Sequence, residues 1–91
     1  MRSDAEKLIE RHAALVHSEM RKVVSHVQRD AGEWIVNTVM TKGCDVPFRY
    51  KRKRMYRSLQ GAFVNMTYYP ATELVAGIEI EIMQVVRIKR A

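Results

Sequence analysis

The chain has 91 residues and a mass of 10.6 kDa, with 47% apolar and 29% charged side chains. This length excludes two separately cored domains, and this composition excludes a disordered tail. Lys and Arg number 16 against 10 Asp and Glu, so the net charge of +6 and the pI near 9.8 favour anionic partners.

The positive charge is concentrated in one segment. Residues 1–33 hold six basic and six acidic side chains, whereas residues 34–91 hold ten basic and four acidic ones. Residues 42–57 alone carry seven cations and a single carboxylate, that of Asp45. This segment therefore accounts for the whole net charge.

The first element that the sequence predicts is a long helix at residues 4–29. Ser3 and Glu6 have the spacing of a capping box, which satisfies two backbone N–H groups at a helix start. Apolar residues then recur at helical spacing, at Leu8, Ile9, Leu15, Val16, Met20, Val23, Val24 and Val27. As an alternative, the β-branched stretch from Val23 and the turn-like residues 29–32 form the first arm of a hairpin.

The rest of the chain, at about 33–90, is predicted to be rich in strands. Strands are predicted at 34–40, 46–54, 62–69 and 78–89. Each of these segments is rich in β-branched and aromatic residues or alternates apolar with polar residues. A turn at 70–72 separates the last two strands. The last strand is expected to bury its even positions, namely Ile78, Ile80, Ile82, Val86 and Ile88.

The predicted fold class is therefore α+β, in a single domain over residues 1–91. One long N-terminal helix is followed by an antiparallel sheet of about four strands, which stays open beneath the helix or curls into a small OB- or SH3-like barrel. A helix of about 25 residues is roughly 38 Å long. It would overhang its own sheet, so the apolar stripe predicts a homodimer through the helix.

The strongest functional signal is a basic run with interleaved tyrosines. Arginine and lysine neutralise phosphates, and tyrosine rings stack on bases. The sequence therefore predicts a small protein that binds RNA or single-stranded DNA, because no predicted helix has a basic face suited to the major groove. The candidate binding residues are Arg49, Tyr50, Lys51, Arg52, Lys53, Arg54, Tyr56 and Arg57, and Lys89 and Arg90 extend the patch.

Other interpretations of the basic run stay open. Lysines and arginines on an edge strand prevent edge-to-edge aggregation, which requires no ligand. A basic patch also fits an acidic protein or an anionic membrane surface. The alternative function is a dimeric protein-interaction or adaptor module, with the long helix as its interface.

The sequence predicts no catalytic residues, no cofactor and no metal site. A nucleophilic Cys44 would need a base, and no histidine follows position 26. Glu79 and Glu81 occupy the exposed face of a strand, where alternation places polar residues without any catalytic role. His12 and His26 would lie about 21 Å apart on the predicted helix, too far apart to share a metal ion. One cysteine and the lack of a long apolar run predict a cytoplasmic protein without membrane insertion.

Overall fold

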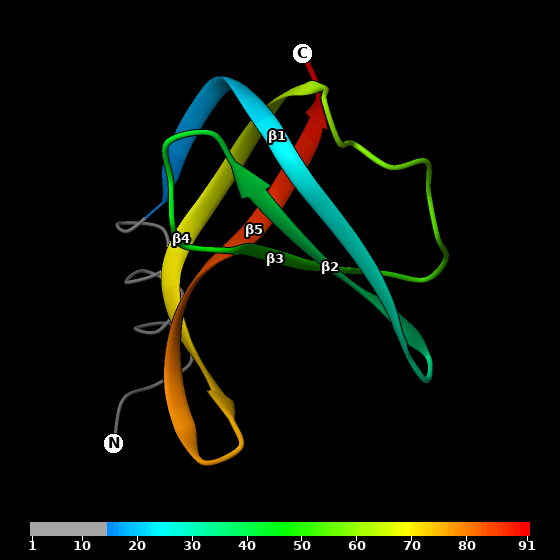
Figure 1. Ribbon diagram of the computed structural model, residues 1–91, viewed down its shortest axis with the longest axis vertical. Coiled ribbons are helices and arrows are strands. Elements are labelled where there is room, and N and C mark those ends of the chain that lie inside the picture. The colour runs from blue at the N-terminus through cyan, green and yellow to red at the C-terminus, as the bar shows by residue number, and fades with distance from the viewer. Residues whose placement is uncertain (1–14) are drawn as a thin grey trace.

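The computed structural model describes residues 15–91, and every regular element in this part of the chain is a β-strand (Figure 1). The strands are β1 (Val16–Ala31), β2 (Trp34–Thr41), β3 (Phe48–Arg52), β4 (Phe63–Val75) and β5 (Ile78–Arg90). They close into a barrel in the order β1-β2-β3-β5-β4, in which only the β3 and β5 pair is parallel. This connectivity is the architecture of a small Greek-key barrel of the OB type.

The predicted α+β class is wrong, because the described part of the predicted helix is a strand. Residues 16–31 form β1, which pairs with β2 and with β4. Residues 4–14 of the predicted helix lie outside the described residues. From Val23 onward the chain forms the first arm of a hairpin with β2, which is the alternative interpretation of this stretch. Within residues 15–91, no helix is long and apolar enough to cross a membrane.

Two β-bulges explain why β1 has a helix-like apolar pattern. The register with β2 shifts between Val23 and Ser25, and the register with β4 shifts between Ser18 and Arg21. Each extra residue moves the side chains that follow to the other face, so the apolar residues lose their period of two. Among the stripe residues that β1 contains, only Val23 belongs to the core, while the other four are exposed: Val16, Met20, Val24 and Val27.

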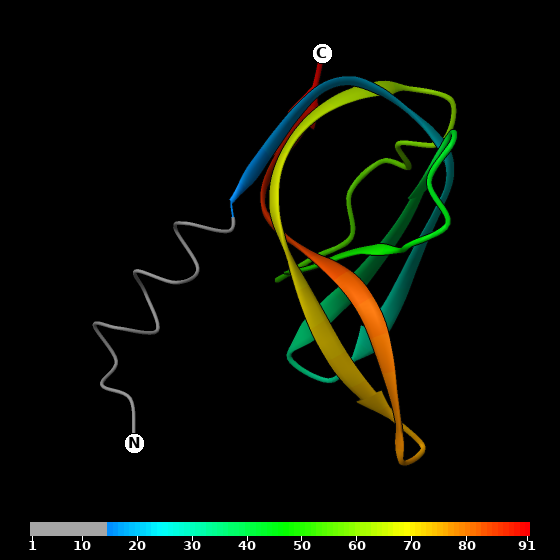
Figure 2. The ribbon, with the colours of Figure 1, turned by 90° about the vertical axis from the view of Figure 1, so that its left-hand side faces the viewer.

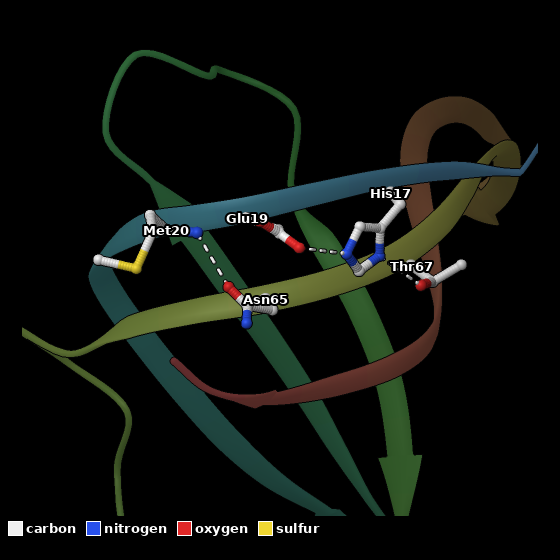
Figure 3. A network of polar contacts seen from close by, with 5 residues as sticks. All are labelled: His17, Glu19, Met20, Asn65 and Thr67. Carbon is white, nitrogen blue, oxygen red and sulfur yellow. Dashed lines mark hydrogen bonds and ion pairs between the residues drawn. The ribbon is translucent and has the colours of Figure 1, made fainter.

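The first bulge is held by side chains of β1 and β4 (Figure 3). Met20 has a positive φ of 55°, and its N–H donates to Asn65 Oδ1 at 3.0 Å. Beside it, His17 Nδ1 lies 3.0 Å from Thr67 Oγ1, and His17 Nε2 lies 3.3 Å from Glu19 Oε1. The Asn65 contact satisfies the Met20 N–H where the ladder between β1 and β4 is interrupted, and the His17 contacts lie beside it.

The core lies inside the barrel and draws on all five strands. The strand predicted at 34–40 is confirmed as β2, whose alternate residues Ile35, Asn37, Val39 and Thr41 are buried. Phe48 of β3, the largest of the described side chains that are fully buried, meets Tyr68 of β4 edge to face with ring centroids 4.8 Å apart. The strand predicted at 46–54 is shorter, because only Phe48–Arg52 pairs with β2.

The turn predicted at 70–72 is wrong, since β4 continues through it. Pro70 lies beyond Tyr68, where the described ladder between β4 and β1 ends, and a residue without an N–H is tolerated outside such a ladder. The chain reverses instead at Ala76 and Gly77, which both have positive φ, as a two-residue hairpin turn of type I′ requires. The resulting hairpin projects beyond the barrel (Figure 2).

The buried face predicted for β5 is correct only in part. Ile82 is buried, but Ile78 lies in the projecting hairpin and is 66% exposed. Val86 is also exposed, whereas Val85 belongs to the core. A register shift against β4 inserts one residue at this point and reverses the alternation.

The positive φ of Met20 provides a test of the bulge. Met20→Gly should raise the free energy of unfolding by up to about 1 kcal/mol, because glycine adopts this conformation without a Cβ penalty and the Met20 side chain is mostly exposed. Val27→Gly, at a similarly exposed position of β1, should lower it by about 0.5–1 kcal/mol. Urea unfolding measures both, and equal destabilisation by the two variants would contradict the interpretation.

Candidate nucleic-acid interface

The predicted basic run divides between the two faces of β3. Arg49 and Lys51 point outward, whereas Tyr50 follows Phe48 toward the barrel interior and is buried. Arg52 ends the strand on the same side as Tyr50, with its guanidinium carbon 5.4 Å from the Tyr50 ring centroid. One continuous charged sequence therefore supplies two different surfaces.

Residues 53–62 form a strap that joins β3 to β4 (Figure 1). Gln28 of β1 holds the strap through both backbone groups of Tyr56: Gln28 Nε2 donates to the carbonyl at 2.6 Å, and the Tyr56 N–H donates to Gln28 Oε1 at 3.0 Å. Arg90 of β5 donates to the Ser58 carbonyl at 3.1 Å. Leu59 packs against the core cluster, so the strap covers one end of the barrel.

His26 of β1 connects the strap to the barrel interior. The Leu59 N–H donates to His26 Nδ1 at 2.9 Å, so this nitrogen is the unprotonated acceptor. Nε2 then carries the hydrogen of the neutral ring and donates to Asn37 Oδ1 at 2.8 Å. Asn37 is only 2% exposed and donates in turn to the Ile35 carbonyl at 3.1 Å. The predicted place of His26 on a helix is wrong.

A hollow of about 210 Å³ lies between the strap and this end of the barrel. It is lined by His26, Asn37, Tyr50, Arg52, Tyr56, Arg57, Leu59, Ile88 and Lys89. Burial raises the pKa of the Tyr50 phenol, against the opposing effect of the Arg52 charge. Tyr50 therefore stays a neutral hydrogen-bond donor at physiological pH, with its hydroxyl 3.5 Å from His26 Nε2.

A gap in the barrel wall continues from the hollow. β3 and β5 pair at only two positions, Phe48 with Met83 and Arg49 with Gln84. Beyond them lies a space of about 430 Å³, lined by Trp34, Tyr50, Lys51, Arg52, Gln84, Val85, Val86, Arg87 and Ile88. The gap and the hollow adjoin, since they share Tyr50, Arg52 and Ile88, and the two together are named the groove. A neighbouring space that shares Tyr50, Lys51 and Gln84 with the gap is lined by Glu73 and is not part of the groove so defined.

The groove is lined by cations and aromatic rings and by no carboxylate. Its cations are Lys51, Arg52, Arg57, Arg87 and Lys89, and its aromatic residues besides His26 are Trp34, Tyr50 and Tyr56. Within residues 15–91, the ion pairs are those of His17 with Glu19 and of Arg49 with Glu73, so no described carboxylate forms an ion pair with a cation of the groove. All five cations are exposed, so an anion that approaches the groove can reach them directly.

The structure brings five of the eight predicted binding residues into the groove: Tyr50, Lys51, Arg52, Tyr56 and Arg57. Arg49 lies outside it and pairs with Glu73 of β4. Lys53 and Arg54 do not line it but lie over the rings of two residues that do, with Lys53 Nζ 4.0 Å from the Trp34 centroid and the Arg54 guanidinium carbon 5.8 Å from that of Tyr56.

Sequence reasoning missed the part that His26, Trp34, Asn37 and Arg87 play in the groove, because these residues lie far from the basic run in sequence. Lys89, predicted as an extension of the patch, lines the hollow. In the described part of the chain, no three His, Cys, Asp or Glu side chains come together as ligands for a metal ion. Comparisons with known protein families, with curated proteins and with solved structures find no match.

The buried position of Tyr50 predicts a distinct alkaline titration. Its phenol should ionise at higher pH than an ordinary tyrosine, and this last phase of the tyrosinate absorbance change should disappear in Tyr50→Phe. The unfolded chain loses the proton near pH 10, so stability is full below that pH and falls as the pH rises above it. Tyr50→Phe should lose less stability over this range, and an unchanged titration would show that Tyr50 is exposed in solution.

Proposed function

We propose that this protein binds single-stranded nucleic acid, RNA or DNA, along the groove. The observation that carries the proposal is the lining of the groove, in which five cations and three aromatic rings occur with no carboxylate. Cations that follow a groove neutralise successive phosphates, and exposed rings stack on unpaired bases regardless of sequence. Barrels of the OB type commonly bind oligonucleotides, which supports the proposal by analogy of fold alone.

The exposed rings favour a single strand over a duplex. Trp34 is 39% exposed and Tyr56 is 55% exposed, as base stacking requires. A duplex is read by a helix or a two-stranded ribbon in its major groove. The projecting ribbon formed by residues 70–82 carries Glu73, Glu79 and Glu81 and no Lys or Arg, so phosphates would repel it.

We place this activity in the cytoplasm. Cys44 is a free thiol, half-buried beside the core cluster, and no second cysteine exists in the chain to form an intrachain disulfide with it. A single reduced thiol suits a reducing compartment.

Charge variants of the groove test the proposal. In fluorescence anisotropy with labelled single-stranded RNA and DNA, Lys51→Gln combined with Arg87→Gln should weaken binding and lower the slope of log affinity against log salt by about 1.4, the value for two phosphate contacts on a single strand. Trp34→Ala should cost about 1–3 kcal/mol through lost stacking. The matched control is Lys22→Gln combined with Lys42→Gln, which removes equal charge from exposed positions outside the groove.

The control separates groove contacts from a general effect of net charge. The control variant should keep a salt slope close to that of the unchanged protein. Equal losses in the two double variants would reduce the binding to non-specific attraction, and binding that does not respond to salt would contradict phosphate contacts altogether.

A second candidate function, assembly of the protein with itself, is favoured by the projecting hairpin. Leu74 is 70% exposed, and Val75, Ile78 and Ile80 are also exposed. Among the described residues, 71–82 pair only within this acidic hairpin, so neither of its edges pairs with another described strand and a second copy, whose groove is basic, can meet it. We expect light scattering to show a concentration-dependent mass that Leu74→Ser combined with Ile78→Ser abolishes. A monomer at all concentrations would exclude this candidate.

A further inference from the structure

We infer that the hollow beneath the strap is a binding site for a terminal phosphate group, the phosphomonoester at the end of a nucleic-acid strand or on a single nucleotide. The inference deepens the proposed function. It rests on that function only in naming nucleic acid as the molecule that carries the phosphate. It assigns the two parts of the groove different tasks: the hollow holds the end group, and the gap holds the chain that follows.

The charge of the hollow matches a dianion. Arg52 comes from β3, Arg57 from the strap and Lys89 from β5, and all three line the same space of about 210 Å³. None of the residues that line this space is acidic. Guanidinium groups match the geometry of phosphate oxygens, and charge-assisted hydrogen bonds of this kind are stronger than neutral ones. Three cations from three segments favour a group with two negative charges.

The inner wall of the hollow adds neutral hydrogen-bond donors. The Tyr50 hydroxyl has only a long contact of 3.5 Å, to His26 Nε2, among the described hydrogen bonds, so its hydrogen is free for a ligand. Asn37 Nδ2 carries two hydrogens, of which one donates to the Ile35 carbonyl. At neutral pH a phosphomonoester carries at most one proton, so its oxygens mainly accept hydrogen bonds. A wall that presents hydrogen-bond donors therefore suits it.

The hollow is open to solvent on its outer side, and its two closed sides, the strap and the inner wall, favour a chain end over an internal phosphodiester. Hydrogen bonds at Tyr56, Ser58 and Leu59 hold the strap down on one side, and the buried Asn37 and Tyr50 close the inner wall. An internal phosphodiester must leave its site in two directions. The hollow continues into the gap, where it shares Tyr50, Arg52 and Ile88, and from there the lining leads to Trp34. A strand that begins in the hollow therefore follows the gap.

Oligonucleotides that differ only at their ends test this inference. Anisotropy should show that a strand with a phosphate at one end binds about tenfold more tightly than the same strand with hydroxyl ends. Separate 5′-phosphate and 3′-phosphate strands identify which end is bound. Arg57→Gln should abolish the preference for phosphate, and Tyr50→Phe should reduce it while leaving the barrel folded. Arg54→Gln, a cation of the same strap that does not line the hollow, should retain it.

A second measurement makes the two proposals separable. Inorganic phosphate and a nucleoside monophosphate are titrated into the full-length protein at constant ionic strength, with sulfate-free buffer, and amide shifts of the strap and of Tyr50 are followed by NMR. We expect saturable shifts near Leu59 and Tyr50 that Arg57→Gln removes and Arg54→Gln leaves in place. Unfolding curves confirm that each variant is folded.

Each outcome decides one proposal or the other. Equal binding of phosphorylated and hydroxyl-ended strands, with the salt dependence intact, overturns the terminal-phosphate site and leaves the proposed function standing. Saturable phosphate shifts without binding of any oligonucleotide overturn the proposed function and leave the site standing, with a small phosphorylated molecule as its ligand. A response to neither probe overturns both.

Discussion

The barrel exists because one strand, β1, pairs with two neighbours that lie on different sides of it. Its first residues pair with β4 and its later residues pair with β2, so β1 must bend sharply between them. Two bulges produce the bend, and at the first of them the Met20 N–H donates a hydrogen bond to the Asn65 side chain. Without this change of partner the sheet would stay open, and the end on which the hollow lies would not form.

Closure on the opposite side of the barrel is much weaker, and the groove is its result. β3 contains only five residues and pairs with β5 at two positions. The remaining backbone of both strands separates, and Lys51, Arg52 and Arg87 line the space that opens. A longer β3–β5 ladder would improve the barrel but close the gap. The candidate site thus lies where β3 and β5 stop pairing. The backbone N–H and C=O groups left unpaired there must bond to polar side chains or water.

The strands that follow β1 can be predicted from the sequence, whereas β1 itself cannot. β2 is predictable because Trp34 to Thr41 is dense in β-branched and aromatic residues and contains no bulge. β1 is not, because each bulge inserts a residue and the apolar spacing then resembles that of a helix. The candidate site follows the same rule. Tyr50 and Arg52 could be predicted from their own segment, whereas Trp34 and Arg87 enter the groove only through the register of β3 with β2 and the divergence of β3 from β5.

Alternation along β3 also directs the side chains of the basic run to two different sides of the strand. Arg49 points outward and pairs with Glu73, which ties the projecting hairpin to the barrel wall. Tyr50 and Arg52 point the other way, into a space closed by the strap that their own segment continues into. The strap in turn is held by Gln28 and His26 of the bent strand β1. The positions of the cations in the hollow therefore depend on the bend of β1, which links the geometry of barrel closure to the charge that the groove presents.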